Sequence, residues 1–409
     1  MPFALRSELH ERVGHYIEST GSDAVERNLD LLAHHYSHSA NLPKTREFLA
    51  RAGDAAQATY ANASAIDYFE RLVPLVEGSA RVDTLLKLGK VLELTGKWKR
   101  AEEVETEALA LAQTQGDDRV RASCETALAE AARKQGRYDD ASARLLSARA
   151  GFETAGDEAG VGMVLHLSGT LAAQRGDYPK AVECYEASIA IRERLGDKAA
   201  LGSLLSNLGV IAEYRGDYVQ AHAFHESALA YRAEVGDRWA LGVSMNNLGV
   251  NAQFRKDYAE ARDWFGKSMQ LCREVGDAWM VAIGHNNLGN ATRGLGDYAS
   301  ARKHYAASLL AYRDYGDRWA LAFLLEDIAV LAALTRDAST ALELLGAADV
   351  LRSAIGAPRA PSVDEEITAQ IAESVSRLTE ADRLSARARG QGWTLDLAIE
   401  RSLAFCTEQ

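Results

Sequence analysis

The apolar positions of the chain recur at helical spacing, and the whole pattern then returns with a period of about 40 residues. One segment carries them at Leu201, Leu205, Leu208 and Ala212. Offsets of four, seven and eleven place such residues on one face of a helix. The same set returns at Leu241, Met245, Leu248 and Ala252, and again at Leu321, Leu325, Ile328 and Ala332. We therefore expect a helix, here called helix A, that occurs once in every repeat.

A second helix, helix B, is predicted between successive A helices by a small residue at a fixed place. The alanines that mark it are Ala101, Ala141, Ala181, Ala221, Ala261, Ala301 and Ala341. Gly-Asp pairs separate the helices, at Gly196 and Gly236 for example, and each pair has a counterpart one period further along the chain. Glycine accepts the left-handed backbone that ends a helix, and aspartate caps the start of the next one. Each repeat is therefore predicted to be a helical hairpin.

Self-similarity at a period of roughly 20 to 50 residues is typical of a repeat array. The Leu208-Gly209 pair of helix A, with Tyr218, Ala221 and Ala228 of helix B, resembles the tetratricopeptide repeat (TPR). Units with Asn-Leu-Gly and Gly-Asp-Tyr are most similar to the longer-period TPRs of the kinesin light chain and Pins (LGN) families. The pattern departs at Lys256, which stands in place of glycine, and at His225, where the family prefers an aromatic residue.

The predicted fold is all-α, a right-handed α-solenoid of stacked antiparallel helical hairpins that forms a TPR superhelix. We expect residues 1–78 to be an N-terminal helical junction or cap, residues 79–345 to be an array of about seven units, and residues 346–409 to be a C-terminal helical cap. Each repeat in such an array packs only on its neighbours, and the array needs no single core. The length of 409 residues therefore does not indicate how many domains the chain has.

The two ends of the chain resemble a different context for such an array. Segments 5–10, 31–36 and 48–56 are similar to the junction between the ATPase module and the TPR arm of bacterial STAND regulators. Related arms occur in transcriptional regulators and in class III adenylate or guanylate cyclase–ATPase proteins. The resemblance implies an ATPase or output domain as a partner, in cis or in trans. The chain itself has no GxxxxGK[ST] phosphate loop.

Charge and cysteine usage narrow the class of partner. The formal net charge is −12, and the excess of acidic residues is spread evenly over the chain, so we expect no direct nucleic-acid binding. The four cysteines, at 124, 184, 272 and 406, lack CxxC spacing and are interpreted as reduced thiols. No apolar run is long enough to span a bilayer, so we expect a cytoplasmic protein without a membrane partner.

Candidate catalytic and metal-binding patterns are few. His10-Glu11 with His15 misses the HExxH zinc motif, since the second histidine comes one residue late and points away from the first. His34 and His38 are four apart and could share a metal, but a structural pair on one helix face is the preferred interpretation. No nucleophile elbow or Gly-rich phosphate loop is present. We expect no enzyme activity, no metal and no cofactor.

The candidate binding site is a row of asparagines on helix A. Asn207, Asn247 and Asn287 are each one repeat period apart and should stack along the groove of the superhelix. Asparagine is a poor helix former, yet its amide can both donate to and accept from an extended peptide backbone. In the resembled families, asparagine at this place binds peptide backbone. The predicted site consists of Asn207, Tyr214, Asn246, Asn247, Phe254, Asn286, Asn287, Asn290 and Arg293.

Two alternatives stay open for these residues. The amides could instead bond to a neighbouring helix and only fix the packing. Trp239, Trp279 and Trp319 also recur once per period and could serve either as packing between units or as an aromatic rim for a partner. The preferred function is a non-catalytic scaffold that binds an extended peptide or protein segment. The alternative is a sensory or autoinhibitory arm of a STAND-type signalling regulator.

Overall fold

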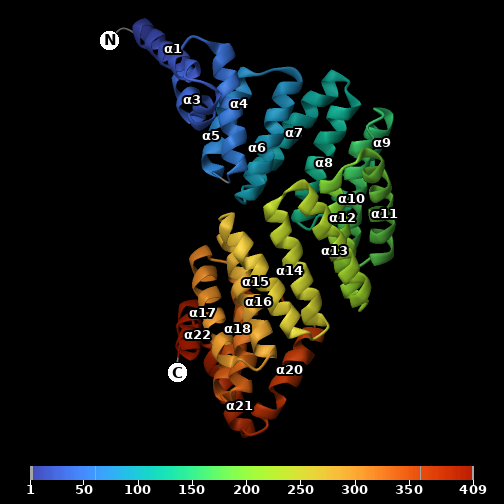
Figure 1. The fold of residues 1–409 in the computed structure, drawn as a ribbon, viewed down its shortest axis with the longest axis vertical. Coiled ribbons are helices and arrows are strands. Elements are labelled where there is room, and N and C mark those ends of the chain that lie inside the picture. The colour runs from blue at the N-terminus through green and yellow to red at the C-terminus, as the bar shows by residue number, and fades with distance from the viewer. Residues whose placement is uncertain (1–2, 60, 360, 408–409) are drawn as a thin grey trace. The chain divides into compact units, whose positions relative to one another are not determined.

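The computed structural model describes residues 3–59, 61–359 and 361–407, and within these ranges the chain is all-α. Its described residues form twenty-two α-helices and one 3₁₀ turn, with no strand among them. The helices succeed one another as antiparallel hairpins, as the colour gradient of Figure 1 lets the reader follow. The predicted all-α array of stacked hairpins is confirmed.

The chain divides into two units, Met1–Gly196 and Asp197–Gln409. The first contains α1 (Phe3–Ser19), α2 (Ser22–Arg27), α3 (Leu29–Ser37), α4 (Leu42–Ala58), α5 (Asn62–Leu72), η1 (Val73–Leu75), α6 (Gly78–Leu94), α7 (Trp98–Gln115), α8 (Asp118–Lys134), α9 (Tyr138–Thr154), α10 (Glu158–Gln174) and α11 (Tyr178–Leu195). The second contains α12 (Lys198–Tyr214), α13 (Tyr218–Val235), α14 (Arg238–Phe254), α15 (Tyr258–Glu274), α16 (Ala278–Gly294), α17 (Tyr298–Tyr315), α18 (Arg318–Leu334), α19 (Ala338–Ala354), α20 (Pro361–Val375), α21 (Glu380–Gln391) and α22 (Leu395–Thr407). The expected boundaries after residues 78 and 345 remain predictions.

The Gly-Asp markers act as the sequence predicted. Gly196 and Gly236 adopt left-handed backbone at the ends of α11 and α13. The side chains of Asp197 and Asp237 accept hydrogen bonds from the backbone N–H groups of the first turns of α12 and α14. Each Gly-Asp pair thus provides hydrogen-bond partners for backbone carbonyl groups at the end of one helix and for backbone N–H groups at the start of the next. Lys256 holds the left-handed conformation without being glycine, at a φ of 61°.

Helices A and B of one hairpin interlock through a glycine and a ring. A Cβ on Gly249 would lie 2.5 Å from the ring of Phe265, and one on Gly289 would lie 2.3 Å from Tyr305. His225 fills the same socket opposite Gly209 and is fully buried. The fixed alanines from Ala101 to Ala341 are all fully buried where the helices cross. In these three hairpins the two helices pack closely because a glycine on helix A leaves room for a flat ring from helix B.

The last hairpin, α18 and α19, has the largest apolar core of the second unit. Helix α18 is buried along most of its length, and α20 packs against it. Helix α21 packs on α19, and α22 lies beside α17 (Figure 1). These helices cover apolar surface that a further repeat would otherwise cover. No helix within the described ranges is both long and apolar enough to cross a bilayer.

Candidate peptide-binding face

The asparagines of the predicted site lie on one face of three successive A helices. Asn207 belongs to α12, Asn246 and Asn247 to α14, and the other three to α16. All six are partly buried, neither enclosed in the core nor fully open to solvent. We call this side of α12, α14, α16 and α18 the A face. The helical register therefore brings the predicted amides together on one surface of the second unit.

Hydrogen bonds connect the amides diagonally from one A helix to the next. Asn287 Nδ2 donates to Asn246 Oδ1 at 2.8 Å. Asn247 Nδ2 makes a longer contact of 3.5 Å to Ser206 Oγ. The two residues of each bond are 41 apart in sequence, one more than the repeat period. Each asparagine therefore bonds to the residue that directly precedes the equivalent asparagine of the preceding repeat. The packing role that the sequence left open is thus present in the structure for two of the three repeated amides.

At the α18 end of the A face, Asp327 of α18 accepts hydrogen bonds from three side chains of α16. Asp327 Oδ2 accepts hydrogen bonds from Asn286 and Asn290 at 3.3 and 3.1 Å. Arg293 donates to the backbone oxygen of Asp327 at 2.8 Å and lies 3.4 Å from its Oδ1. Burial raises the pKa of Asp327, against the effect of Arg293 and the two amides. The acidic partner of Arg293 therefore lies within this chain.

Between α14 and α16 the A face keeps unused hydrogen-bonding capacity. Asn246 accepts from Asn287 but donates no bond through its own Nδ2 within the described residues. The side-chain oxygens of Gln253 and Asn286 are buried and accept no hydrogen bond there. Buried polar atoms normally find partners, so such atoms mark places where a ligand could add bonds. The capacity for a further partner is concentrated between α14 and α16.

Two aromatic side chains of the predicted site stand at the ends of their helices. Tyr214 ends α12 with 71% of its surface exposed, and Phe254 ends α14 with 51% exposed. The Phe254 ring stacks on Tyr218, with centroids 5.6 Å apart and planes 7° from parallel. On α16 the next such position is Gly294, where a Cβ would meet the ring of Tyr258 at 2.4 Å. The aromatic pair therefore borders the α12 and α14 region.

The three repeated tryptophans have a structural partner but are not buried. Trp239 Nε1 donates to Asp277 Oδ2 at 2.8 Å, and Trp279 makes a longer bond of 3.4 Å to Asp317. Each aspartate also caps its own helix, so the indole links one repeat to the next. Trp319 stacks against Phe323 instead. All three rings remain about half exposed, which leaves them able to contact a partner as well.

Two clusters in the first unit were not foreseen from the sequence. Glu105 takes the ring's place opposite Gly89, fully buried, near Glu93, which is held by Lys134 at 2.7 Å. Four histidines, His10 of α1, His34 and His35 of α3, and His38 directly after α3, also gather at the N-terminal end. The spacing of His34 and His38 is visible in the sequence, but the approach of His10 to them, like that of Glu105 to Gly89, depends on the pairing of helices. Within the described ranges no group of three or more His, Cys, Asp or Glu is arranged to hold a metal ion.

Comparison with solved structures identifies the architecture. The quorum sensor NprR from B. thuringiensis aligns with a TM-score of 0.58 and 15% identity, over 83% of this chain and 97% of that one. The Rap conjugation gene regulator of plasmid pLS20, in complex with the Phr* peptide, aligns with a TM-score of 0.55 and 14% identity, over 77% and 96%. At these identities the likeness is one of fold.

A STAND protein with a tetratricopeptide repeat sensor, from Pyrococcus horikoshii, aligns with a TM-score of 0.50 and 13% identity. The alignment covers 98% of this chain and 55% of that one. No curated protein matches the sequence significantly. Family models described as tetratricopeptide repeat match residues 79–154, 160–234 and 241–275. The repeat array of this chain is therefore built from tetratricopeptide repeats.

Proposed function

We propose that the chain is a non-catalytic scaffold whose A face binds an extended peptide or a protein segment in extended form. The observation that carries this proposal is the partly buried amide row, in which Asn246 Nδ2 donates no bond and the buried side-chain oxygens of Gln253 and Asn286 accept none within the described residues. An extended backbone presents N–H and C=O groups in alternation, and asparagine can pair with both. The peptide complex of the Rap regulator, which shares the fold, supports the same class of partner.

The nine predicted residues divide into two roles in this proposal. Asn207, Asn246, Asn247 and Asn287 contact the backbone of the partner, and Tyr214 and Phe254 contact its side chains. Asn286, Asn290 and Arg293 are bound to Asp327, so they hold α16 and α18 in register. Aromatic side chains supply much of the energy of interfaces because they bury a large area at small entropic cost. The contacts of the partner therefore centre on α12 and α14.

The test compares affinity with stability in one triple variant. A random peptide library is selected on the immobilised full chain, and the enriched peptides are synthesised as probes. Asn207→Ala, Asn247→Ala and Asn287→Ala together should weaken the probe by on the order of 3 kcal/mol, because each lost bond in a partly desolvated site costs about 1 kcal/mol. Alanine is the better helix former, which limits the loss of stability.

The control is the variant Asn290→Ala, whose amide donates to Asp327 and accepts from Tyr305, so both ends of the amide are already engaged within the chain. It should lower the melting temperature while leaving the probe affinity of the folded protein within about twofold. A triple variant that loses melting temperature but binds the probe as tightly as the parent would contradict the proposal. Calorimetric titration and thermal unfolding on one preparation separate these outcomes.

A second candidate is a sensory arm of a STAND-type regulator. Besides the resemblance of the N-terminal segments, it is supported by the outer side of α1, where Leu5, Leu9, Val13 and Tyr16 are exposed. The first three of these recur at every fourth position and therefore share one helix face. An attached ATPase domain would cover such a stripe. Sequencing of the native gene upstream of Met1 tests this candidate, since it requires a P-loop ATPase in the same or a neighbouring reading frame.

A further inference from the structure

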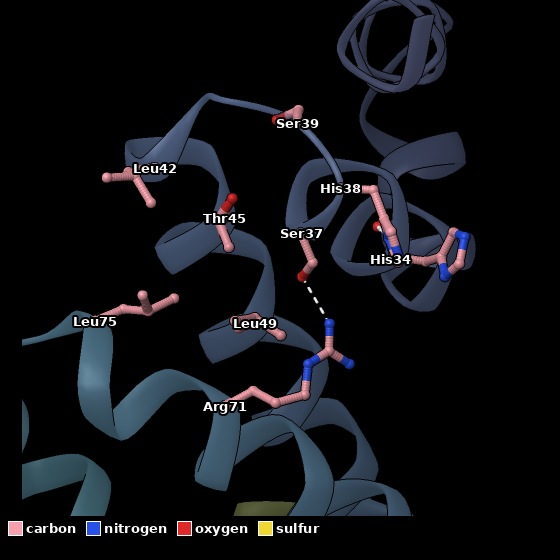
Figure 2. A pocket seen from close by; sticks show the side chains of 9 residues that line it. All are labelled: His34, Ser37, His38, Ser39, Leu42, Thr45, Leu49, Arg71 and Leu75. Carbon is pink, nitrogen blue, oxygen red and sulfur yellow. Dashed lines mark hydrogen bonds between the residues drawn. The ribbon is translucent and has the colours of Figure 1, made fainter. Parts of the chain in front are cut away.

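Four imidazole rings meet where helix α1 contacts helix α3. His10 of α1 lies with its ring centroid 5.1 Å from those of His35 and His38 and 5.8 Å from that of His34. The His34 and His38 centroids are 4.5 Å apart. In Figure 2 both His34 and His38 extend from α3 at one edge of a pocket of about 430 Å³ that Leu42, Thr45 and Leu49 of α4 also line. We call the four histidines the imidazole cluster.

One bond in the imidazole cluster depends directly on protonation. His10 Nδ1 and His35 Nδ1 are 2.9 Å apart, so one nitrogen donates its hydrogen and the other accepts it. An imidazolium has hydrogens on both nitrogens and cannot accept. When both rings are protonated, the bond is lost and two like charges face each other. His38 Nδ1 bonds to the backbone oxygen of His34 at 2.8 Å, which fixes that ring beside the pair.

The rest of the α1 attachment is mostly polar. Along α1 only Gly14 is fully buried among the residues whose burial is described, and a Cβ there would meet the Tyr36 ring at 2.7 Å. Tyr36 donates its hydroxyl hydrogen to Glu18, which also accepts from Lys44 at 2.6 Å. Asn41 donates to Glu11 at 2.8 Å. With little apolar area buried, α1 lacks the main force that would hold it against a repulsive contact.

We propose that the contact between α1 and α3 is a proton-operated latch, in which protonation of the imidazole cluster releases helix α1 from the rest of the first unit. At neutral pH the His10–His35 bond holds the helix. As the pH falls, the cluster becomes a group of like charges shared between two helices, and separation of the helices relieves their repulsion. Release uncovers the side of Tyr36 that Gly14 covers.

The charged groups around the cluster favour release rather than oppose it. Arg6 on α1 and the other imidazoles are the charged groups that act on His10 and His35. Burial lowers the pKa of both rings, and these positive neighbours lower it further. The carboxylates of α1 do not pair with the cluster, since Glu11 accepts from Asn41 and Glu18 accepts from Tyr36 and Lys44. From the other packed helices, Lys44 of α4 pairs with Glu18 and Glu47, and Arg71 of α5 donates to Ser37.

The sign of the pH effect follows from the lowered pKa values. Release of α1 removes the burial and the positive neighbours that lower the pKa of His10, so this pKa returns towards its ordinary value of about 6.5. His35 stays on α3 and loses the effect of His10, so its pKa also rises on release. The docked state is therefore favoured fully above about pH 6.5, and it loses stability as the pH falls below that value.

Amide hydrogen exchange on the full, metal-free chain tests the latch. Exchange rates are compared at about pH 7.5 and about pH 5.5 after correction for the intrinsic pH dependence. The amides of residues 4–18 should lose protection about tenfold or more at the lower pH, while those of α4 and α5 keep theirs. Equal protection of α1 at both pH values would overturn the proposal.

The double variant His10→Asn with His35→Asn removes the titrating groups but allows an amide–amide bond. It should remove the pH response of α1, and persistence of that response would overturn the latch. His304→Asn is the matched control, because His304 makes a similar 3.1 Å contact with His285 in the second unit. It should leave the response of α1 unchanged.

If the double variant leaves α1 unprotected at both pH values, single variants of the exposed residues His34 and His38 test the latch instead. His34→Asn and His38→Asn each remove a positive neighbour of His10 and His35, so the repulsion between α1 and α3 is weaker and the midpoint of release should move to lower pH. A midpoint that stays unchanged in both variants would overturn the proposal. Protection of α1 by added Zn²⁺ at about pH 7.5, with no response to pH in metal-free protein, would also overturn it in favour of a helix held by metal.

Discussion

The same socket of the repeat is filled by a carboxyl group in α6 and α7 and by a phenol in α16 and α17. Opposite Gly289, Tyr305 is fully buried and donates its hydroxyl hydrogen to Asn290 at 2.6 Å. Opposite Gly89, Glu105 is 1% exposed, and its Oε2 finds no hydrogen-bond partner among the described residues. In both places a glycine leaves room for the side chain of the facing helix, while the chemistry of that side chain differs.

The two sockets differ mainly in whether the buried polar atoms of the side chain that fills them have hydrogen-bond partners. Tyr305 is linked through Asn290 to Asp327 and Arg293, so every member of that network has a partner. Burial raises the pKa of Glu105 to about 8, and the nearby charge of Glu93 contributes to the increase. A satisfied buried network stabilises one arrangement, whereas an unsatisfied buried carboxyl costs free energy whenever it ionises. The repeat framework tolerates both.

The largest expected effect comes from opening the satisfied network. Asp327→Ala should lower the free energy of unfolding by about 3 kcal/mol, because it leaves the Arg293 charge without its carboxylate and two amides without their acceptor. Only 22% of the Asp327 side chain and 14% of that of Arg293 are exposed, so water replaces little of the loss. Chemical denaturation measures the change. Asp327→Asn keeps an acceptor and should cost less, and equal losses in the two variants would contradict this account.

The repeat framework could be predicted from the sequence because it depends on local chemistry. Gly196 and Asp197, for instance, end one helix and cap the next within a few residues. The candidate site was predicted less completely. Spacing placed Asn247 and Asn287 on one face, but the diagonal bond from Asn287 to Asn246 depends on the offset between neighbouring helices.

Other features could not be predicted because they depend on contacts between distant segments. Asp327 is not among the predicted site residues, and its bonds to Asn286 and Asn290 follow from the packing of α18 on α16. The meeting of His10 with His35 requires α1 to fold back on α3, for which no short motif exists. Likewise, the position of Glu105 under Gly89 is recognised only once the socket is known from the other repeats.

A smaller effect is expected from the unsatisfied socket, and it depends on pH. The folded-state pKa of Glu105, about 8, lies above its ordinary value of 4.5, so its penalty is absent below about pH 4.5 and grows as the pH rises towards 8. Glu105→Gln should therefore raise the free energy of unfolding by about 2 kcal/mol near pH 8 and hardly change it near pH 4.5. Denaturant unfolding across this range measures the difference.

The matched control for the first socket is Glu103→Gln, which removes an exposed carboxylate on the same helix that pairs with Arg100. It should leave the pH dependence of unfolding as it is in the parent protein. A parent protein whose stability does not fall between about pH 5 and pH 8 would show that Glu105 is not buried as an unpaired acid.

The smallest expected effect lies at a turn, where Lys256 replaces the glycine found at Gly216 and Gly296. Its φ of 61° is costly for a residue with a Cβ, whereas glycine adopts it freely. Lys256→Gly should raise the free energy of unfolding by about 0.5 to 1 kcal/mol, measured as a shift of the denaturation midpoint at constant slope. Lys256→Ala removes the charge but keeps the Cβ, so it should give none of this gain. If alanine stabilised the chain as much as glycine, the lysine charge rather than the backbone conformation would be the cause. In that case the charge of Lys256 would destabilise the turn, whereas its left-handed backbone would cost little free energy.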